Sequence, residues 1–375
     1  MESHPLDFEK PILELQRRLQ DLKSHSDQHD LDFDTEVEAM ENKIRETRRQ
    51  IYDNLTAWQR VQLARHIKRP FALDYIARCF TDWVELHGDR FFGDDKAMPS
   101  GLAKLGPHRC VVVTHQKGRD TKENVMRNFG CAHPEGYRKA LRLMRHAEKF
   151  GFPVITFIDT PGANPGLQSE ERGMAFAIAD DLLAMLTLRV PVIAVVIGEG
   201  GSGGALAIGV GDRILMLENA IYSVASPESA AAILWRTAAN APQAATAMRI
   251  RAQDAAEFGI VDRLITEPEG GAQTDVPAIV EQVRQALQEE LAALEAQVRS
   301  KRKDGGIEGL LAARRAKYMR IGVFRETGAP AKARPSKPTN GHAGAAAAAP
   351  ARAPARGAAS AVNGAAEAPA THDQA

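Results

Sequence analysis

The sequence has few cysteines and no apolar run long enough to cross a membrane. It contains three cysteines, Cys79, Cys110 and Cys131. None of them shows CxxC spacing, which excludes a disulfide framework and a zinc site built on paired cysteines. The longest apolar stretches, near residues 182–198, are interrupted by Arg189 and Pro191, so no membrane-spanning helix is expected. We therefore expect a cytoplasmic protein with reduced thiols.

The sequence also lacks an excess of either charge. Lysine plus arginine and aspartate plus glutamate each number 48, which gives a formal net charge of zero. No overall field then draws the protein onto nucleic acid or an acidic membrane, and neither is expected as a partner. Residues 1–20 are charged and contain prolines, so they are not expected to form a targeting leader. Any anion site must be local.

The chain is long enough, at 375 residues with 44% hydrophobic residues, to bury a large core and carry attachments. Apolar residues recur at helical spacing in two charged segments near the amino terminus: Ile12, Leu15, Leu19 and Leu22, then Val37, Met40, Ile44, Ile51 and Leu55. This pattern predicts a helical hairpin, followed by a short helix over 70–80. We expect residues 1–80 to form a packed amphipathic arm, because too few heptads are sustained for a partner-binding coiled coil.

Strand and helix patterns alternate over residues 81–325. Strands are predicted at 101–105, 110–115, 154–158, 190–197, 213–217 and 260–265, and helices at 134–150, 169–188, 205–210, 227–235, 242–251 and 276–298. The alternation predicts an α/β body whose strands are covered on both faces. After Gly328 the composition becomes rich in alanine, proline and glycine. Residues 326–375 are therefore predicted to be a disordered, solvated tail.

The most informative segment is a glycine-rich stretch over residues 198–211. It reads Gly-Glu-Gly-Gly-Ser-Gly-Gly-Ala-Leu-Ala-Ile-Gly-Val-Gly and directly follows the apolar run 190–197. A buried strand is thus expected to end in a glycine loop that opens a short helix. Glycines allow a ligand to approach the main chain, and the first amides of a helix lack an internal partner. The pattern predicts a place that binds negative charge.

A dinucleotide site is one interpretation of this segment. Gly198, Gly200 and Gly203 satisfy GxGxxG after a strand, and Glu218 lies about where the ribose-binding carboxylate is expected. However, Gly209 and the residues that follow it stop the helix after about two turns, which is too short for the crossover helix of a dinucleotide fold.

A serine nucleophile is the second interpretation, because Gly200–Gly204 also satisfies GxSxG with Ser202 at its centre. That fold places its histidine after the serine, and beyond Ser202 the sequence has only His342 and His372, both in the predicted tail. His115 and His133 lie upstream and would require another topology. Otherwise Ser202 is a small hydroxyl residue tolerated in a tight loop.

The third interpretation needs no nucleophile. The amides of Gly203 and Gly204, at the start of the helix, would stabilise an enolate or ureido oxyanion. The spacing alone favours this no more than it favours glycines that merely permit close packing of helix and strand.

Several longer segments occur in register with the glycine segment. They are FIDTPGANPG (157–166), EERG (170–173), HQKGRDTKE (115–123), PEGYRKALRLM (134–144) and YSVASPE (222–228). Together with GEGGSGGALAIGVGD (198–212) they resemble the alpha subunits of acetyl-CoA carboxylase carboxyltransferases over roughly residues 5–325. The resemblance implies a crotonase-like fold of repeated ββα units, and pairing with a related beta subunit in an α2β2 assembly whose active sites lie between the two kinds of subunit.

The resemblance also implies an activity. The family transfers a carboxyl group from carboxybiotin, supplied on the biotin carboxyl carrier protein after biotin carboxylase has loaded it, to acetyl-CoA. The product, malonyl-CoA, enters fatty acid synthesis. Gly203 and Gly204 match the glycines whose amides bind the biotin oxyanion, and the enolate hole belongs to the beta subunit. The remaining candidate pocket residues are Gly200, Gly201, Thr160, Pro161, Gly162, Lys117 and Arg119.

Nearby polar residues are given supporting roles. Glu199 is interpreted as a carboxylate that favours the helix dipole, and Asp159 as a turn-capping residue. At Asn164 the family usually has an aromatic residue, so a stacking role there is in doubt. A set of basic residues is expected to meet CoA phosphates or an acidic partner, or simply to form a solvated face. These are Lys117, Arg119, Lys122, Arg127, Arg138, Lys139 and Arg142.

Several features of the complete enzyme are missing from this chain. It has no counterpart of the four-cysteine zinc ribbon, which the resemblance assigns to the beta subunit, no biotin-bearing lysine motif and no P-loop. We therefore expect no covalently bound cofactor. Two other functions stay open at this stage: a stand-alone crotonase-type acyl-CoA hydratase or isomerase, which would need pocket carboxylates for proton transfer, and a scaffold without activity.

Overall fold

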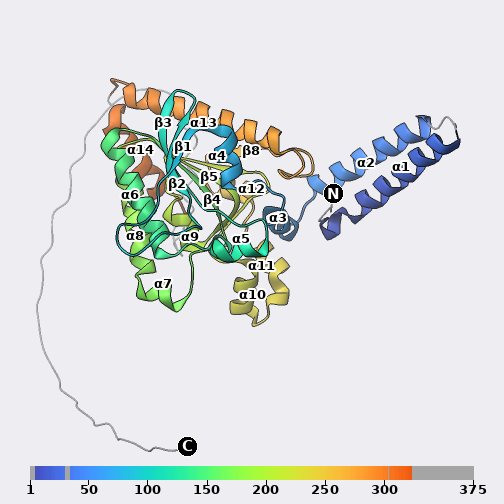
Figure 1. Cartoon of the computed structure of the whole chain (residues 1–375), viewed down its shortest axis with the longest axis horizontal. Helices are drawn as coiled ribbons and strands as arrows, with labels where there is room; N and C mark the ends of the chain where they lie inside the picture. Colours follow the sequence, from blue (N-terminus) through green and yellow to red (C-terminus); the bar gives the residue numbers. More distant parts are fainter. Residues whose placement is uncertain (1–4, 30–33, 303, 323–375) are drawn as a thin grey trace, which may run out of the picture. The chain divides into compact units, whose positions relative to one another are not determined.

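The computed structural model describes residues 5–29, 34–302 and 304–322. At the amino terminus a short 3-10 helix and two long helices form the predicted hairpin (Figure 1): η1 (Asp7–Glu9), α1 (Lys10–His29) and α2 (Asp34–Asp53). Ile12 and Ile44 are buried, while the charged residues face outward. The predicted tail at 326–375 lies outside the described residues, and the domain boundary at residue 80 stays a prediction.

The body is built on a mixed sheet. Its strands are β1 (Thr81–Glu85), β2 (Ser100–Leu105), β3 (His108–Thr114), β4 (Val154–Thr160), β5 (Val192–Gly201), β6 (Arg213–Leu217), β7 (Ile221–Ser223) and β8 (Arg263–Ile265). Their spatial order is β1-β2-β3-β4-β5-β6-β8, with β7 paired to β5 outside this path. The pairs β1–β2 and β2–β3 are antiparallel, and all later pairs are parallel.

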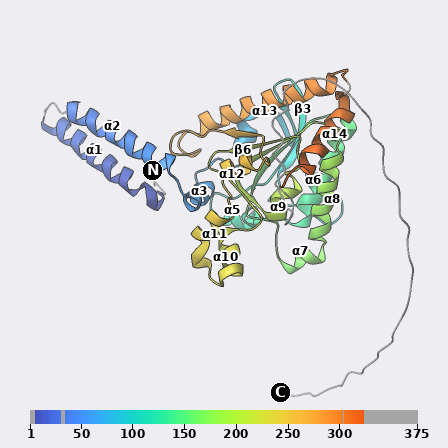
Figure 2. The ribbon, with the colours of Figure 1, turned by 180° about the vertical axis from the view of Figure 1, so that it is seen from behind.

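Helices cover both faces of this sheet (Figures 1 and 2). On one face lie α6 (Pro134–Phe150), α8 (Met174–Thr187) and α9 (Ser202–Ala207). On the other lie α4 (Ala72–Cys79) and the long α13 (Val276–Arg299). β4 shows the two faces: the Phe157 ring stacks on Tyr75 of α4, while Thr156 Oγ1 donates to the carbonyl of Ile208 at the end of α9.

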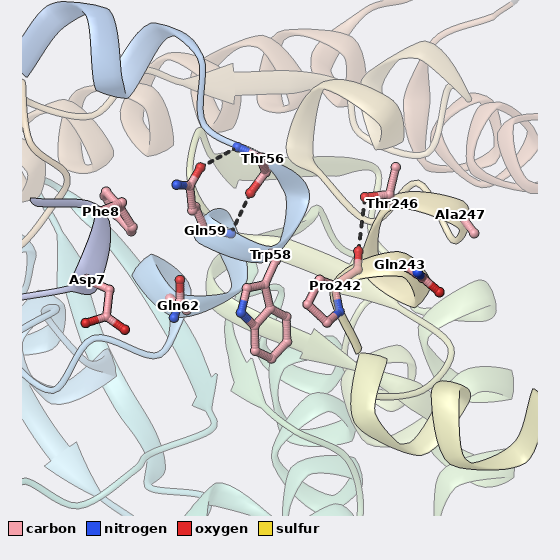
Figure 3. Close-up of a pocket in the computed structure, with 10 residues that line it drawn as sticks. All are labelled: Asp7, Phe8, Thr56, Trp58, Gln59, Gln62, Pro242, Gln243, Thr246 and Ala247. Atoms are coloured by element: carbon pink, nitrogen blue, oxygen red, sulfur yellow. Dashed lines mark hydrogen bonds between the residues drawn. The ribbon is translucent and has the colours of Figure 1, made fainter. Parts of the chain in front are cut away.

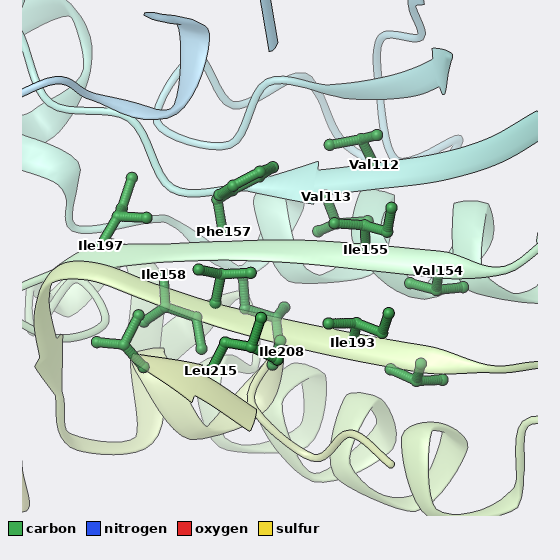
Figure 4. Packing of buried hydrophobic residues seen from close by; sticks show 14 of the residues in the cluster. Val112, Val113, Val154, Ile155, Phe157, Ile158, Ile193, Ile197, Ile208 and Leu215 are labelled. Atoms are coloured by element: carbon green, nitrogen blue, oxygen red, sulfur yellow. The ribbon is translucent and has the colours of Figure 1, made fainter. Parts of the chain in front are cut away.

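The strands are apolar on both faces because both faces are covered, and every residue of β4 and β5 is buried. Figure 4 shows valine, isoleucine and phenylalanine side chains of β3, β4 and β5 packed between the layers, with Ile208 and Leu215 beside them. The predicted α/β body with strands covered on both sides is therefore confirmed.

Shorter helices complete the body. They are α3 (Ala57–Ala64), α5 (Thr121–Met126), η2 (Asn128–Gly130), α7 (Leu167–Glu171), α10 (Pro227–Trp235), η3 (Ala238–Asn240), α11 (Ala241–Ala247), α12 (Ala252–Glu257) and α14 (Gly306–Met319). Arg314 of α14 is buried and pairs with Asp212 at 2.6 Å, which ties the last helix to the turn before β6. None of the helices that the structure describes is long and apolar enough to span a membrane.

Several predicted elements differ from the structure. The helix predicted over 242–251 ends at Ala247, and the strand predicted over 260–265 begins only at Arg263. The helix predicted over 169–188 is two helices, α7 and α8, because Gly173 between them has a φ of +80°. The strand predicted to end at residue 197 continues through Gly201. In consequence the following helix begins at Ser202, three residues earlier than expected. By contrast, the bounds of α6, β6 and α10 are those that the sequence predicts.

Candidate functional site

The glycine segment forms a sharp turn from strand to helix. β5 ends at Gly201, and α9 begins at Ser202, whose φ is +55°. Ser202 is exposed and Gly203 half-exposed, whereas Gly204 is buried. A positive φ at a non-glycine residue is uncommon and marks a locally strained turn. The helix therefore leaves the strand abruptly, with its first amides at the carboxyl end of β5.

Close backbone packing explains three of the glycines. A Cβ on Gly201 would lie 2.1 Å from the carbonyl oxygen of Pro161, and one on Gly200 would lie 2.3 Å from the ring of Tyr222. A Cβ on Gly204 would lie 2.5 Å from the amide nitrogen of Ala163. Gly203 differs, since its nearest neighbour would be Ile178 at 3.6 Å. Packing alone therefore requires glycine at 200, 201 and 204, but not at 203.

The turn after β4 lies beside this segment. Thr160 pairs with Gly200 across the two strands, and its Oγ1 accepts from the amide of Gly162 at 3.1 Å. Gly162 has a φ of +155°, and its carbonyl accepts from the same Thr160 hydroxyl at 2.7 Å. The structure thus brings together the predicted pocket residues Thr160, Pro161, Gly162, Gly200, Gly201, Gly203 and Gly204.

Asn164 has a definite role in this second loop. Its side-chain oxygen accepts from the amide of Gly166 at 2.7 Å and from the hydroxyl of Ser169 at 2.9 Å. Its own amide donates to the carbonyl of Ala132 at 3.0 Å. The amide side chain therefore shapes the loop by hydrogen bonds, which an aromatic ring at this position would not make.

Within the described part of the chain, the amides of Gly203 and Gly204 have no acceptor. They belong to the second and third residues of α9, ahead of the first amide that bonds within a helix. Among the turn, loop and capping hydrogen bonds of the described residues, neither amide is a donor. Such amides bind negative charge when a ligand supplies it.

Two acidic residues lie in other settings than the sequence suggested. Glu199 is not a carboxylate at the helix start: it lies inside β5 and forms ion pairs with Lys117 and Arg65, each at 2.7 Å. Asp159 does not cap the turn that follows it. Its Oδ1 accepts from the amide of Glu199 at 2.9 Å and lies 2.7 Å from Nζ of Lys117. Both corrections arise from contacts between residues far apart in the chain.

Lys117 and Arg119 do not project together into solvent. Nζ of Lys117 is held by Asp159 and Glu199, and its side chain is 13% exposed. The Arg119 guanidinium lies 4.0 Å from the centre of the Phe71 ring and pairs with Asp74. Both charges are compensated within the chain, while their predicted contact with CoA phosphates stays a prediction.

Most of the other basic residues are also paired rather than forming a solvated face. Arg127 pairs with Glu123, Arg138 with Asp89 and Glu135, and Lys139 with Asp94, while Arg142 donates to the carbonyl of Gly88. Lys122 is exposed at the start of α5.

Sequence reasoning missed two arginines that contact the glycine strand. Nε of the buried Arg69 donates to the carbonyl of Ile197 at 2.7 Å, and its guanidinium pairs with the buried Glu267. Arg65 links Glu199 to Glu228 of α10. Neither arginine has a motif around it. The one available signal is that both follow an amphipathic helix and precede Pro70, in a stretch with four basic side chains in five residues.

The serine and dinucleotide interpretations are not supported by the contacts. His133 Nδ1 lies 2.9 Å from Ser169 Oγ, and neither ring nitrogen of the buried His115 has a partner in the described ranges. Neither histidine is therefore hydrogen-bonded to Ser202. His342 and His372 lie outside the described residues. α9 has only six residues, and the Glu218 carboxylate accepts from the amide of Glu267 at 3.3 Å.

A separate surface pocket lies between η1, α3 and α11 (Figure 3). Its volume is about 710 Å³, and Trp58 and Pro242 line its centre. None of its lining residues belongs to the glycine segment or to the loop after β4. This pocket is therefore separate from the site at the glycine segment.

Comparison with known proteins decides the family. Residues 5–322 match the family described as "Acetyl co-enzyme A carboxylase carboxyltransferase-like". The chain belongs to this family. It is 51% identical over 322 residues to the acetyl-coenzyme A carboxylase carboxyl transferase subunit alpha of Thermus thermophilus, covering 86% of this chain and 99% of that protein. The corresponding subunit of Syntrophotalea carbinolica is 55% identical over 287 residues, or 76% of this chain and 90% of that one.

The fold is also found in a solved carboxyltransferase. The chain resembles a crystal structure of transcarboxylase 12S with methylmalonyl-coenzyme A bound, with a TM-score of 0.51 and 22% identity. The match covers 64% of this chain and 46% of that one. The predicted crotonase-like α/β class is thereby confirmed, and the chain is an enzyme subunit of the carboxyltransferase family.

Proposed function

We propose that this chain, joined to a beta subunit in an α2β2 assembly, transfers the carboxyl group of carboxybiotin to acetyl-CoA and so forms malonyl-CoA. The observation that carries the proposal is the pair of unbonded amides at Gly203 and Gly204, at the first turn of α9, in a member of this family. The partners would be the beta subunit, the biotin carboxyl carrier protein and biotin carboxylase, in the cytoplasm. Zinc is expected in the beta subunit only.

The chemistry asks for stabilisation of charge rather than for a protein base. When the bond between the biotin nitrogen and the carboxyl carbon breaks, carbon dioxide leaves and negative charge spreads onto the ureido oxygen. The Gly203 and Gly204 amides would donate to that oxygen. The ureido nitrogen then takes a proton from the methyl group of acetyl-CoA, and the resulting enolate attacks carbon dioxide to form the new carbon–carbon bond. Amides help most when they are already oriented before the charge develops.

The surrounding residues would exclude water and fix this geometry. Thr160, Pro161 and Gly162 support one side through their contacts with Gly200, Gly201 and Gly204. A Cβ on Gly203 would make only an ordinary van der Waals contact, with Ile178 at 3.6 Å, and biotin would enter from the side of this residue. The proposal leaves the second oxyanion site, for the acetyl-CoA enolate, to the beta subunit. The chain alone should therefore be inactive.

The test deletes one amide without a clash. Proline at 203 removes the donor, and its Cβ has room because only Ile178 lies near, at 3.6 Å. Ser202→Gly is introduced as well, because glycine adopts the positive φ at 202 without strain beside a proline. In the complex reconstituted with the beta subunit and carboxylated carrier, we expect kcat to fall about 10²-fold to 10³-fold, as for other oxyanion donors.

The matched control is Ser202→Gly with Gly203→Ala, which adds a methyl group but keeps the amide. It should retain far more of the rate, and both variants should assemble with the beta subunit by mass. Equal rates in the two variants would overturn the oxyanion role. Malonyl-CoA formation by the purified chain alone would overturn the shared site, and hydration of an enoyl-CoA without biotin would favour a stand-alone hydratase.

A further inference from the structure

The pairing of β5 with its neighbouring strands is interrupted. Opposite β4, Val196 pairs with Ile158 and Gly200 pairs with Thr160, so residues 197–199 of β5 face the single residue Asp159. On its other side β5 pairs with β6 up to Val196 and with β7 from Glu199 onward. The strand thus contains a bulge at 197–199, and at this bulge it changes partner.

Side chains satisfy the backbone groups that the bulge withdraws from the ladder. The Glu199 amide donates to Asp159 Oδ1 at 2.9 Å, and the Ile197 carbonyl accepts from Nε of Arg69 at 2.7 Å. Gly198 leaves the space that Asp159 occupies, because a Cβ there would lie 2.4 Å from Asp159 Oδ1. A bulge held in this way re-aims the chain that follows it.

Lys117 is the cation that makes this arrangement possible. Its Nζ lies 2.7 Å from Asp159 Oδ1 and 2.7 Å from Glu199 Oε2, and both carboxylates are almost fully buried. Burial opposes the charged ammonium, but the two carboxylates outweigh it and raise the pKa of Lys117 above its ordinary value. Its stem packs against Gly130, where a Cβ would lie 2.9 Å from Lys117 Cγ. Two carboxylates therefore fix the ammonium group, and Gly130 fixes the aliphatic stem that carries it.

We infer that Lys117 is a positioning residue for carboxyl transfer: through Asp159 and Glu199 it holds the β5 bulge, and thereby the direction in which the Gly203 and Gly204 amides point. The inference rests on the proposed function, since it concerns the same amides. It assigns the lysine to the chain's own backbone and not to a phosphate of coenzyme A. Four residues separate Glu199 from Gly204, so a shift at the bulge is transmitted directly to the first turn of α9.

The first test measures backbone order without any activity. Hydrogen exchange of peptides covering 197–204 is compared in the full-length wild type, Lys117→Met and Lys104→Met. Lys104 is a matched control, because it pairs with Asp82 at 2.6 Å but on the exposed edge of the sheet. We expect faster exchange over 197–204 in Lys117→Met alone, with α13 unchanged. Equal protection in all three proteins would overturn the inference, whether or not the chain is a carboxyltransferase.

The second test separates positioning from phosphate binding. The reconstituted complex is assayed with acetyl-CoA and with acetyl-dephospho-CoA, which lacks the 3′-phosphate. For Lys117→Met we expect kcat to fall by about 10²-fold, the effect of a displacement of about 1 Å. The ratio of the two KM values should stay at its wild-type value. A raised KM for acetyl-CoA that equals the KM for acetyl-dephospho-CoA would overturn the inference in favour of a phosphate contact.

A charge-balanced variant keeps the inference testable if Lys117→Met does not fold. In Lys117→Met with Asp159→Asn, one cation and one anion are removed together, while the asparagine oxygen still accepts from the Glu199 amide. We expect this double variant to recover protection over 197–204 and part of kcat relative to either single variant. No recovery would mean that the lysine acts otherwise. If Gly203→Pro is as active as its Gly203→Ala control while Lys117→Met exchanges faster over 197–204, the proposed function is overturned. The role of Lys117 in holding the β5 bulge is not.

Discussion

The two halves of β5 are held in place by different forces. From Val192 to Val196 the strand is aliphatic and hydrogen-bonds to β4 and β6, and every side chain packs in the core. From Ile197 to Gly201 it is mostly glycine. Charged side chains from the segment after α3, from β4 and from the loop after β3 bind its backbone and its one carboxylate. The first five residues of the strand are thus held by burial and regular strand pairing, whereas the bulge in the next five is held by hydrogen bonds and ion pairs with charged side chains.

This difference between the two halves of β5 indicates which half should govern the free energy of unfolding and which should govern kcat. Apolar packing is non-directional and is the main favourable contribution to folding, so the first half should govern the free energy of unfolding. Buried ion pairs add little net stability when complete, but they fix geometry. The second half should therefore govern kcat more than it governs unfolding. Three substitutions test this contrast.

The largest loss of stability is expected in the apolar half. Ile193 is fully buried between the two helical layers. Ile193→Ala should lower the free energy of unfolding by about 2 to 5 kcal/mol, from lost burial and the cavity left behind. Urea unfolding followed by circular dichroism measures this change. The folded variant should keep its KM for acetyl-CoA, and a kcat loss larger than that of Gly203→Pro would contradict the division between the halves.

A smaller loss of stability with a larger loss of activity is expected at the bulge. Gly198→Ala places a methyl group 2.4 Å from Asp159 Oδ1. This carboxylate cannot move aside easily, because Lys117 and the Glu199 amide hold it. Overpacking of this kind costs about 1 to 3 kcal/mol. Gly93→Ala is the control, since a Cβ there meets only Glu135 Cγ at 4.0 Å. The contrast fails if Gly198→Ala unfolds more readily than Ile193→Ala yet retains full kcat.

The sequence reveals the first half of β5 and conceals the second. A run of valine and isoleucine between turn signals predicts a buried strand, and the glycines that follow, with the long motifs in register, predict the fold and the position of the site. The assignments of Glu199 and Asp159 were wrong because their partners, Lys117 and Arg65, come from the loop after β3 and from the residue that follows α3. Such pairings depend on how distant elements meet, which no local periodicity encodes.

The same limit applies to the break between α7 and α8. One apolar pattern runs through both helices, and only the positive φ at Gly173 separates them. Similarly, the sequence did not predict α14, whose anchoring depends on Arg314 reaching Asp212 about a hundred positions earlier in the chain. Local patterns predicted the main strands and helices of the body but not β1, β7 or α14, and tertiary contacts set the ends and attachments of the elements.

The smallest effect at neutral pH, and the most specific in its pH dependence, is expected at His115, whose amide hydrogen-bonds to the carbonyl of Phe157 in β4. Its ring is fully buried beside Tyr137, and neither ring nitrogen has a hydrogen-bond partner among the residues that the structure describes. Burial, with a smaller contribution from Lys117, lowers the pKa of His115 to about 3. In an unfolded chain the pKa of a histidine is about 6.5.

Between these two pKa values the unfolded chain binds one proton more than the folded one at this site. The free energy of unfolding must then fall as the pH falls below about 6.5, with a slope from His115 of about 1.4 kcal/mol per pH unit. His115→Phe should remove that slope between pH 6 and pH 4, as measured by urea unfolding at each pH. At pH 7, where both states are neutral, the variant should be as stable as the wild type or more stable, because two buried polar atoms without partners are lost. An unchanged slope would mean that His115 is protonated in the folded chain. The buried surroundings of the ring would then hold a positive charge for which the described residues provide no compensating partner.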